Sequence, residues 1–356
     1  MTLEIVILNQ KRTFTIADSN VTINDCKTFE GEQKTFKISD RLSCVLLLSG
    51  NSEFDSQKMK NFIDEYVSKT NFNEINSIEE IRKTLSESIA KSSRNLTLDE
   101  YVESTFAEFQ KSVKKSIKIL DGKEQIIQFL KLNSFGANVD FLSENKLLES
   151  NLNKLTNSLF DIKSKGEFEL IKYYLKQTYV TFLISNSPNI VLVGYDGVNE
   201  NPTYINYAML FNNEGKIETI VKYSVYDCVS TMIFSIAQDD DVDLVLTGFN
   251  DNTFIDINHV VLELLDEFGN LNQLDQSISD SISEELKTKI DEIKLGNLKN
   301  IIDYIKILPD TEILKLLDAL IVLTSIKMKF SSEVHSVGEK RVKTVLRKYR
   351  DVSFFE

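Results

Sequence analysis

The side chains that most often carry enzyme chemistry are scarce in this chain. Its only histidines are His259 and His335, and its only cysteines are Cys26, Cys44 and Cys228. The histidines lie far apart in the sequence, and no two cysteines have a C-x-x-C spacing. Clustered imidazoles or thiolates are therefore nearly excluded, so we expect neither a zinc site nor a Ser-His-Asp triad.

The acidic run Asp239–Asp243 offers carboxylates at alternate positions, as a calcium-binding loop would. Leu244 stands where such a loop needs glycine, however, and Asn250 stands where it needs a bidentate glutamate. The run is better explained as a helix start, where the helix dipole favours negative charge. Since the chain also lacks a glycine-rich phosphate fingerprint, we predict no metal and no cofactor.

The N-terminus offers a different chemistry. Thr2 follows Met1 directly, and a small second residue generally permits removal of the initiator methionine. The α-amine thus freed has a pKa of about 7.7–8.0, so near neutral pH it can accept the threonine hydroxyl proton without any histidine. One residue would then supply both nucleophile and base. Taken singly, Thr2 is explained more simply as an ordinary strand residue.

The elements that must position such a site follow the order β, α, β, α, β. Two β-rich runs, 2–8 and 13–19, joined by four polar residues predict an N-terminal hairpin. Helical spacing follows over much of 55–185 and again from about 227 to 330. The other predicted strands are 21–23, 35–38, 44–48, 190–195, 203–211, 217–223, 333–337, 341–347 and 352–355. Without a βαβ rhythm, this order predicts an α+β fold with two sheets and helix layers.

Composition and charge restrict the partners. The 356 residues carry a formal net charge of −13, which opposes a broad attraction to nucleic acid. The basic run 340–350 alternates with apolar residues and is interpreted as an exposed strand whose charges protect a sheet edge. The chain shows no signal peptide and no uncharged apolar run of 18 residues. We therefore expect a cytoplasmic protein that binds neither nucleic acid nor membrane.

Within the first fifty residues, Asp18 stands sixteen residues after Thr2 and Lys34 thirty-two after it, and Ser49-Gly50 closes the next buried strand. With these spacings, the segment resembles the start of a proteasome β-type subunit, a family of N-terminal nucleophile (Ntn) hydrolases. The second β block also resembles that family, in the stretches 193–197, 202–204 and 213–215, as does the segment 331–338. These matches cover about half of the chain.

This resemblance implies a four-layer αββα sandwich. Residues 1–356 would form a single proteasome-like domain, with helical insertions at roughly 55–185 and 250–310. Thr2 would attack the carbonyl of a peptide or other amide substrate. Lys34 would lower the proton affinity of the nucleophile, Asp18 would keep Lys34 charged, and the backbone N–H of Gly50 would stabilise the oxyanion. Such proteins often form rings, so a homo-oligomer is expected.

The chain also departs from the family pattern. Asn20 stands where the family usually has arginine, and Gly338-Glu339 replaces a late Gly-Gly. The leading hypothesis is a threonine-type amide hydrolase or peptidase. The alternative is a catalytically inactive Ntn-fold protein that serves as an interaction or assembly module. A third hypothesis, an unrelated α+β protein, requires Thr2, Asp18 and Lys34 to lie far apart.

Overall fold

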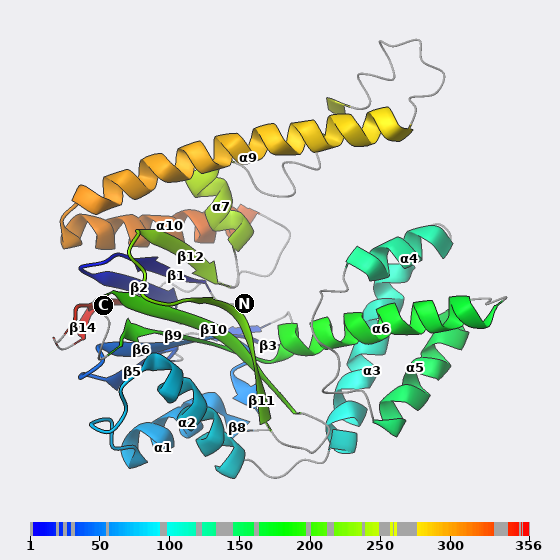
Figure 1. Ribbon diagram of the computed structural model, residues 1–356, viewed down its shortest axis with the longest axis horizontal. Helices are drawn as coiled ribbons and strands as arrows, with labels where there is room; N and C mark the ends of the chain where they lie inside the picture. Colours follow the sequence, from blue (N-terminus) through cyan, green and yellow to red (C-terminus); the bar gives the residue numbers. More distant parts are fainter. Residues whose placement is uncertain are drawn as a thin grey trace. The chain divides into compact units, whose positions relative to one another are not determined.

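Both helices and antiparallel strands build this protein, which is therefore of the α+β class (Figure 1). A computed structural model describes the following residues: 3–18, 21–23, 27–29, 33–54, 57–92, 98–118, 123–132, 145–159, 164–196, 201–211, 217–236, 239–248, 257–258, 260–261, 276–330, 341–348, 350 and 352–355. None of the helices described is long and apolar enough to cross a membrane.

The first sheet contains the N-terminal hairpin. Its strand order is β12-β1-β2-β13-β14, from Met232–Ile236, Glu4–Leu8, Thr13–Asp18, Arg341–Leu346 and Ser353–Phe355. Strands β1 and β2 pair antiparallel, with Glu4 opposite Ala17, so the predicted hairpin is confirmed. Its turn is closed by a hydrogen bond of 3.1 Å from Arg12 N to Asn9 O.

Strand β12 corrects one expectation from the sequence. The helical pattern was predicted to begin at about residue 227, but Met232–Ile236 is a strand that pairs antiparallel with β1. Four of its five residues are apolar, and a run that short suits a buried helix as well as a strand. Pairing with β1, more than two hundred residues earlier in the chain, decides between the two.

Strand β13 corrects another. It was expected at a sheet edge, but it lies between β2 and β14, and Thr344, Val345 and Leu346 are buried. Its basic residues are accommodated by one acid, because Lys343 Nζ and Arg341 Nη1 lie 2.8 and 3.3 Å from the carboxylate oxygens of Asp318. These cations thus have a partner within the fold. The predicted strand at 333–337 lies outside the described residues.

The second sheet has the order β11-β10-β9-β6-β5. Its strands are Ile217–Val225, Pro202–Phe211, Pro188–Tyr195, Cys44–Gly50 and Thr35–Ser39. Nearly every residue of β6, β9 and β10 is buried, as expected of strands covered on both faces. Two short ribbons accompany the sheets, β3 (Val21–Ile23) with β4 (Lys27–Phe29), and β7 (Glu53–Phe54) with β8 (Gln57–Lys58).

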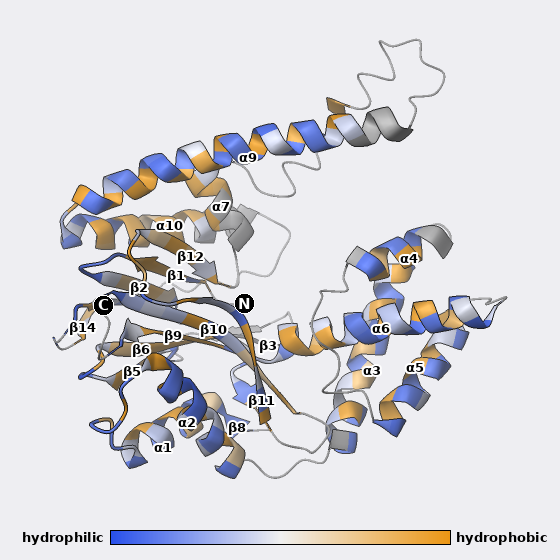
Figure 2. Cartoon of the chain, in the orientation of Figure 1, coloured by the Kyte–Doolittle hydropathy of each residue, from blue (hydrophilic) through white to orange (hydrophobic). Residues whose placement is uncertain are grey.

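The chain divides into two compact units, and the first contains the N-terminal hairpin. This unit comprises Met1–Ser49, Val193–Tyr204 and Val225–Glu356. Its helices are α7 (Asp239–Thr247), α9 (Gln276–Ile307) and α10 (Asp310–Phe330), which lie beside the first sheet in Figure 1. Hydrophilic and hydrophobic residues alternate along α9 (Figure 2), a pattern typical of a helix with one buried face.

The core of the first unit forms between one face of the N-terminal hairpin and the apolar face of a helix. Leu3, Ile5 and Ile7 recur at every second residue, as one face of a strand requires, and they pack with Phe14 and Ile16 of β2. The helical partners recur at three- and four-residue steps in α10: Ile313, Leu317, Leu320 and Ile321. Because the odd-numbered residues of β1 face this core, alternation directs Glu4, Val6 and Leu8 to the opposite face of the sheet.

The second unit, Gly50–Leu192 with Ile205–Ser224, is mainly helical. Its helices are α1 (Met59–Lys69), α2 (Ile78–Ser92), α3 (Leu98–Ile117), α4 (Lys123–Leu132), α5 (Lys146–Leu159) and α6 (Lys165–Asn186). Helix α6 begins at an N-cap, Ser164, whose hydroxyl accepts a hydrogen bond of 3.2 Å from Glu167 N. Tyr179 of α6 contacts the rings of Phe106 and Phe109 in α3, so aromatic packing joins these two helices.

Candidate active site

A buried ion pair joins two of the residues that the sequence singled out. Asp18 ends β2, and Lys34 directly precedes β5, so each stands where a strand meets a loop. Lys34 Nζ donates a hydrogen bond of 2.9 Å to Asp18 Oδ1, and the two side chains are 5% and 0% exposed. Burying a charged pair costs desolvation energy unless hydrogen bonds compensate it. The hydrogen bond between Lys34 and Asp18 supplies such compensation, and the structure brings these two predicted residues together.

The N-terminal strand is attached to the same carboxylate. Leu3 N donates to Asp18 Oδ1 at 3.3 Å, and Asp18 N donates back to Leu3 O at 3.2 Å. The lysine is held through its backbone as well, since Leu48 N of β6 donates to Lys34 O at 2.9 Å. Asp18 Oδ1 thus accepts hydrogen bonds from the lysine and from the first described amide of the chain.

A third ionisable group lies at this pair, one that the sequence reasoning missed. Glu4 of β1 is 0% exposed, and neither of its carboxylate oxygens accepts a hydrogen bond from any residue that the structure describes. Burial raises the pKa of Glu4 to about 8; the positive charge of Lys34 opposes this rise, and the negative charge of Asp18 adds to it. The available signal was one acidic residue within the apolar run Leu3–Leu8.

Gly50 occupies a backbone conformation that favours glycine. It ends β6 with a φ of +72°, in the left-handed region that other residues rarely adopt. A Cβ atom at this position would lie 3.0 Å from Ser187 O, a tight contact that would require the neighbouring backbone to shift. Gly50 belongs to the second compact unit. Its assignment as an oxyanion donor stays a prediction, and Thr2 lies outside the described residues.

The other candidates that lie among the described residues contribute no competing site. Cys44 and Cys228 are buried and form no disulfide, and burial raises the pKa of both thiols, which disfavours the reactive thiolate. Helix α7 begins at Asp239, as the acidic run predicted. The described residues hold no group of three or more His, Cys, Asp or Glu side chains suited to a metal ion. Three candidates lie outside the described residues: His259, His335 and Cys26.

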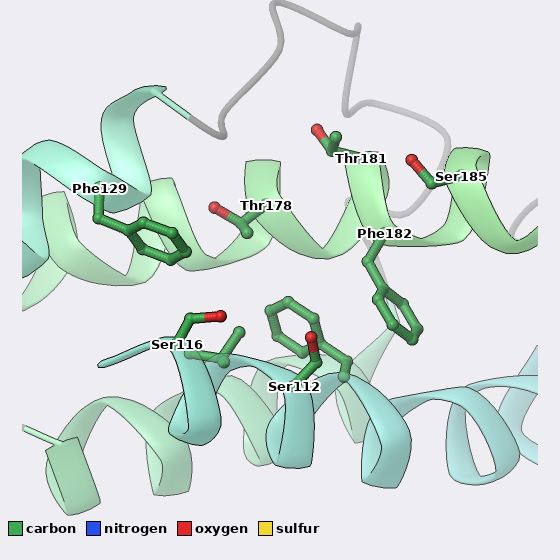
Figure 3. Close-up of a pocket in the computed structure, with 9 residues that line it drawn as sticks. Ser112, Ser116, Phe129, Thr178, Thr181, Phe182 and Ser185 are labelled. Atoms are coloured by element: carbon green, nitrogen blue, oxygen red, sulfur yellow. The ribbon is translucent and has the colours of Figure 1, made fainter. Parts of the chain in front are cut away.

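A cavity of about 220 Å³ lies among α3, α4 and α6 in the second unit. Its walls carry hydroxyl groups and phenyl rings but no charged side chain (Figure 3), from Phe109, Ser112, Val113, Ser116, Phe129, Thr178, Thr181, Phe182 and Ser185. The hydroxyls of Thr178 and Thr181 donate to carbonyl oxygens of their own helix, at 2.8 and 3.1 Å. The wall holds hydroxyl groups but no ionisable side chain that could activate one of them as a base, so we do not take this cavity as a catalytic site.

Comparisons with known proteins add little to this picture. No protein-family model matches the chain, and no curated protein matches its sequence. Among solved structures, the chain is similar to one described as the Anbu (Gly-1) mutant from Hyphomicrobium sp. strain MC1. The TM-score is 0.39 and the sequence identity 10%, over 99% of this chain and 85% of that one. At these values, nothing about the function of this chain follows from the likeness.

Proposed function

We propose that this chain is an Ntn hydrolase that cleaves amide or peptide bonds with processed Thr2 as nucleophile. The observation that carries the proposal is the buried Asp18–Lys34 ion pair, whose carboxylate also accepts a hydrogen bond from Leu3 N. A peptide bond joins that nitrogen to residue 2. Residue 2 is therefore covalently attached to the atom that contacts Asp18.

The chemistry would be an acyl transfer in two steps. The free α-amine of Thr2 would accept the hydroxyl proton while Oγ1 attacks the substrate carbonyl carbon, and the same proton would then pass to the departing amine. Water would hydrolyse the resulting ester and restore the hydroxyl. The positive charge of Lys34, held in place by Asp18, would lower the cost of deprotonating Oγ1. The N–H of Gly50 would stabilise the negative charge on the carbonyl oxygen.

The wider architecture belongs to the same proposal. We infer a single Ntn-hydrolase domain over 1–356 with a four-layer αββα arrangement, in which the helices at roughly 55–185 and 250–310 are insertions. A cytoplasmic homo-oligomer acting on peptides without a cofactor fits this inference. The two five-stranded sheets and the buried ion pair at the end of β2 support it.

One observation favours the alternative, an inactive Ntn-fold protein used for assembly. Helix α9 exposes several large apolar side chains to solvent, between 48% and 78% of each: Ile293, Leu295, Tyr304 and Ile307. Exposed apolar groups of this kind often mark contact surfaces between proteins. An assembly role would need neither removal of Met1 nor a reactive hydroxyl at Thr2.

Covalent labelling distinguishes the two functions. The native protein is treated with a β-lactone, which acylates an activated hydroxyl, and intact mass and peptide mapping locate the label. We expect Met1 to be absent and Thr2 to be labelled, with both labelling and peptide hydrolysis lost in Thr2→Ala. Thr288→Ala, a change at an exposed threonine of α9, is the matched control and keeps both. Retention of Met1, or full hydrolysis by Thr2→Ala, contradicts catalysis by Thr2.

A further inference from the structure

Glu4 is a buried acid that the proposed reaction does not use. Its carboxyl group is fully buried, lies within electrostatic reach of Lys34 and Asp18, and accepts no hydrogen bond from the described residues. Its register partners on the neighbouring strands, Ala17 of β2 and Ile236 of β12, carry no charge. Among the described residues, the charged groups that shift the pKa of Glu4 are Lys34 and Asp18.

We propose that Glu4 is a positioning residue of the candidate active site, which acts through Lys34 by changing the net charge of the buried cluster. This inference rests on the proposed function of Thr2. Alternation along β1 directs Glu4 away from the helix-facing core of Leu3, Ile5 and Ile7. The same strand follows Leu3, whose backbone nitrogen donates to Asp18 Oδ1 and is joined by a peptide bond to residue 2.

Protonation of Glu4 decides the charge of this cluster. With Glu4 neutral, the positive charge of Lys34 balances that of Asp18, and the cluster has no net charge. When Glu4 releases its proton to solvent, the cluster gains a charge of −1 inside the protein. A nearby negative charge raises the pKa of an amine and opposes deprotonation of a hydroxyl. The first effect leaves less of the Thr2 amine in its free form at a given pH, and the second makes the Thr2 hydroxyl a poorer nucleophile.

The pH range of this change follows from burial, which raises the pKa of Glu4 to about 8. Below that pH the carboxyl group holds its proton and the site is in its active charge state. Above that pH, more of the Thr2 amine is free, but the added negative charge opposes deprotonation of the Thr2 hydroxyl and lowers its reactivity. The labelling rate of the wild-type protein should therefore level off or fall above about pH 8.

The test measures the rate at which a β-lactone labels Thr2, in the wild type and in Glu4→Gln, between about pH 6.5 and pH 9. Glu4→Gln replaces the acid by a neutral group of the same shape. The ratio of the variant rate to the wild-type rate should rise on the order of threefold to tenfold over this range, since one pKa unit changes a protonation ratio tenfold. Glu4→Met, also neutral, should behave alike if Glu4→Gln folds poorly. Glu53→Gln, a change at an exposed glutamate, is the matched control and should leave the ratio constant.

A second readout separates this inference from the proposed function. The infrared C=O band of a protonated carboxyl group, taken as the difference between wild type and Glu4→Gln, follows Glu4 without any substrate or label. A band that disappears near pH 8, together with the rising ratio, supports the inference. Labelling of Thr2 with a constant ratio, or with Glu4 ionised at neutral pH, overturns it and leaves the proposed function standing. Absence of Thr2 labelling at every pH overturns both.

Discussion

Glu4 should make the protein less stable as the pH rises through the neutral range. Its pKa is about 8 in the folded protein and 4.5 in the unfolded chain, so between these values the folded state holds a proton that the unfolded state has lost. Below about pH 4.5 both states are protonated and Glu4 has no effect. Above it, unfolding releases a proton, and the free energy of unfolding decreases with each pH unit until about pH 8.

The size of the effect follows from linkage. Each pH unit in this window changes the free energy of unfolding by about 1.4 kcal/mol for one proton. Between about pH 5.5 and pH 7.5 the contribution of Glu4 therefore falls by about 3 kcal/mol. Because native proteins are stable by only about 5–15 kcal/mol, this change is large enough to measure.

The Glu4→Gln variant isolates this contribution. The amide that replaces the carboxyl group is neutral at every pH, so the stability of the variant relative to wild type should increase by about 3 kcal/mol between about pH 5.5 and pH 7.5. Urea unfolding at several pH values, followed by far-UV circular dichroism, measures the difference. A constant cost from the amide itself cancels in this comparison, since only the pH dependence is used. Glu53→Gln removes an exposed carboxylate and should give a curve parallel to that of the wild type.

One result would refute the reasoning on Glu4. If the stability difference between Glu4→Gln and wild type stays constant from about pH 5.5 to pH 7.5, Glu4 has the same ionisation state in the folded and unfolded protein. The burial of this carboxyl group would then not control its protonation. Ionisation of Glu4 at neutral pH would also remove the basis for its effect on Lys34.

Two further predictions concern the ion pair and the glycine. Lys34→Met leaves Asp18 as a buried, uncompensated charge. It should therefore lower the free energy of unfolding, measured by urea unfolding, by about 3–5 kcal/mol. Combining Lys34→Met with Asp18→Asn should recover part of that loss. Recovery of nothing would argue against pairing as the cause. Gly50→Ala should cost at least about 1–2 kcal/mol, because a Cβ is strained at positive φ and would also meet a backbone oxygen. Gly166→Ala, with open space at its Cβ position, should cost far less when both variants are compared by urea unfolding.

Local sequence patterns were sufficient to predict much of the fold. The apolar runs and the polar connection at the N-terminus predicted the β1–β2 hairpin, because alternation and turn residues act over a few neighbours. The acidic run predicted the start of α7 at Asp239 for the same reason. Local patterns do not reveal which distant strand a segment pairs with. For this reason β12 was predicted as part of a helical region and β13 as an edge strand.

The candidate site was only partly visible in the sequence. The resemblance to proteasome β-type subunits implied that Asp18 and Lys34 pair, and the structure joins them at 2.9 Å. Glu4 was missed because a single acid in an apolar strand has no local partner to reveal its environment. Its importance depends on burial and on Lys34, a residue thirty positions away in the chain.

The sequence by itself determined which residue types this protein has for chemistry: few imidazoles, few thiols, and a threonine directly after Met1. It also determined the local elements, whose periodicity depends on near neighbours. Only the tertiary structure decided that Asp18, Lys34 and Glu4 share one buried environment. The physical reason is that desolvation and ion pairing depend on what surrounds a group in space, and distant strands supply those surroundings here.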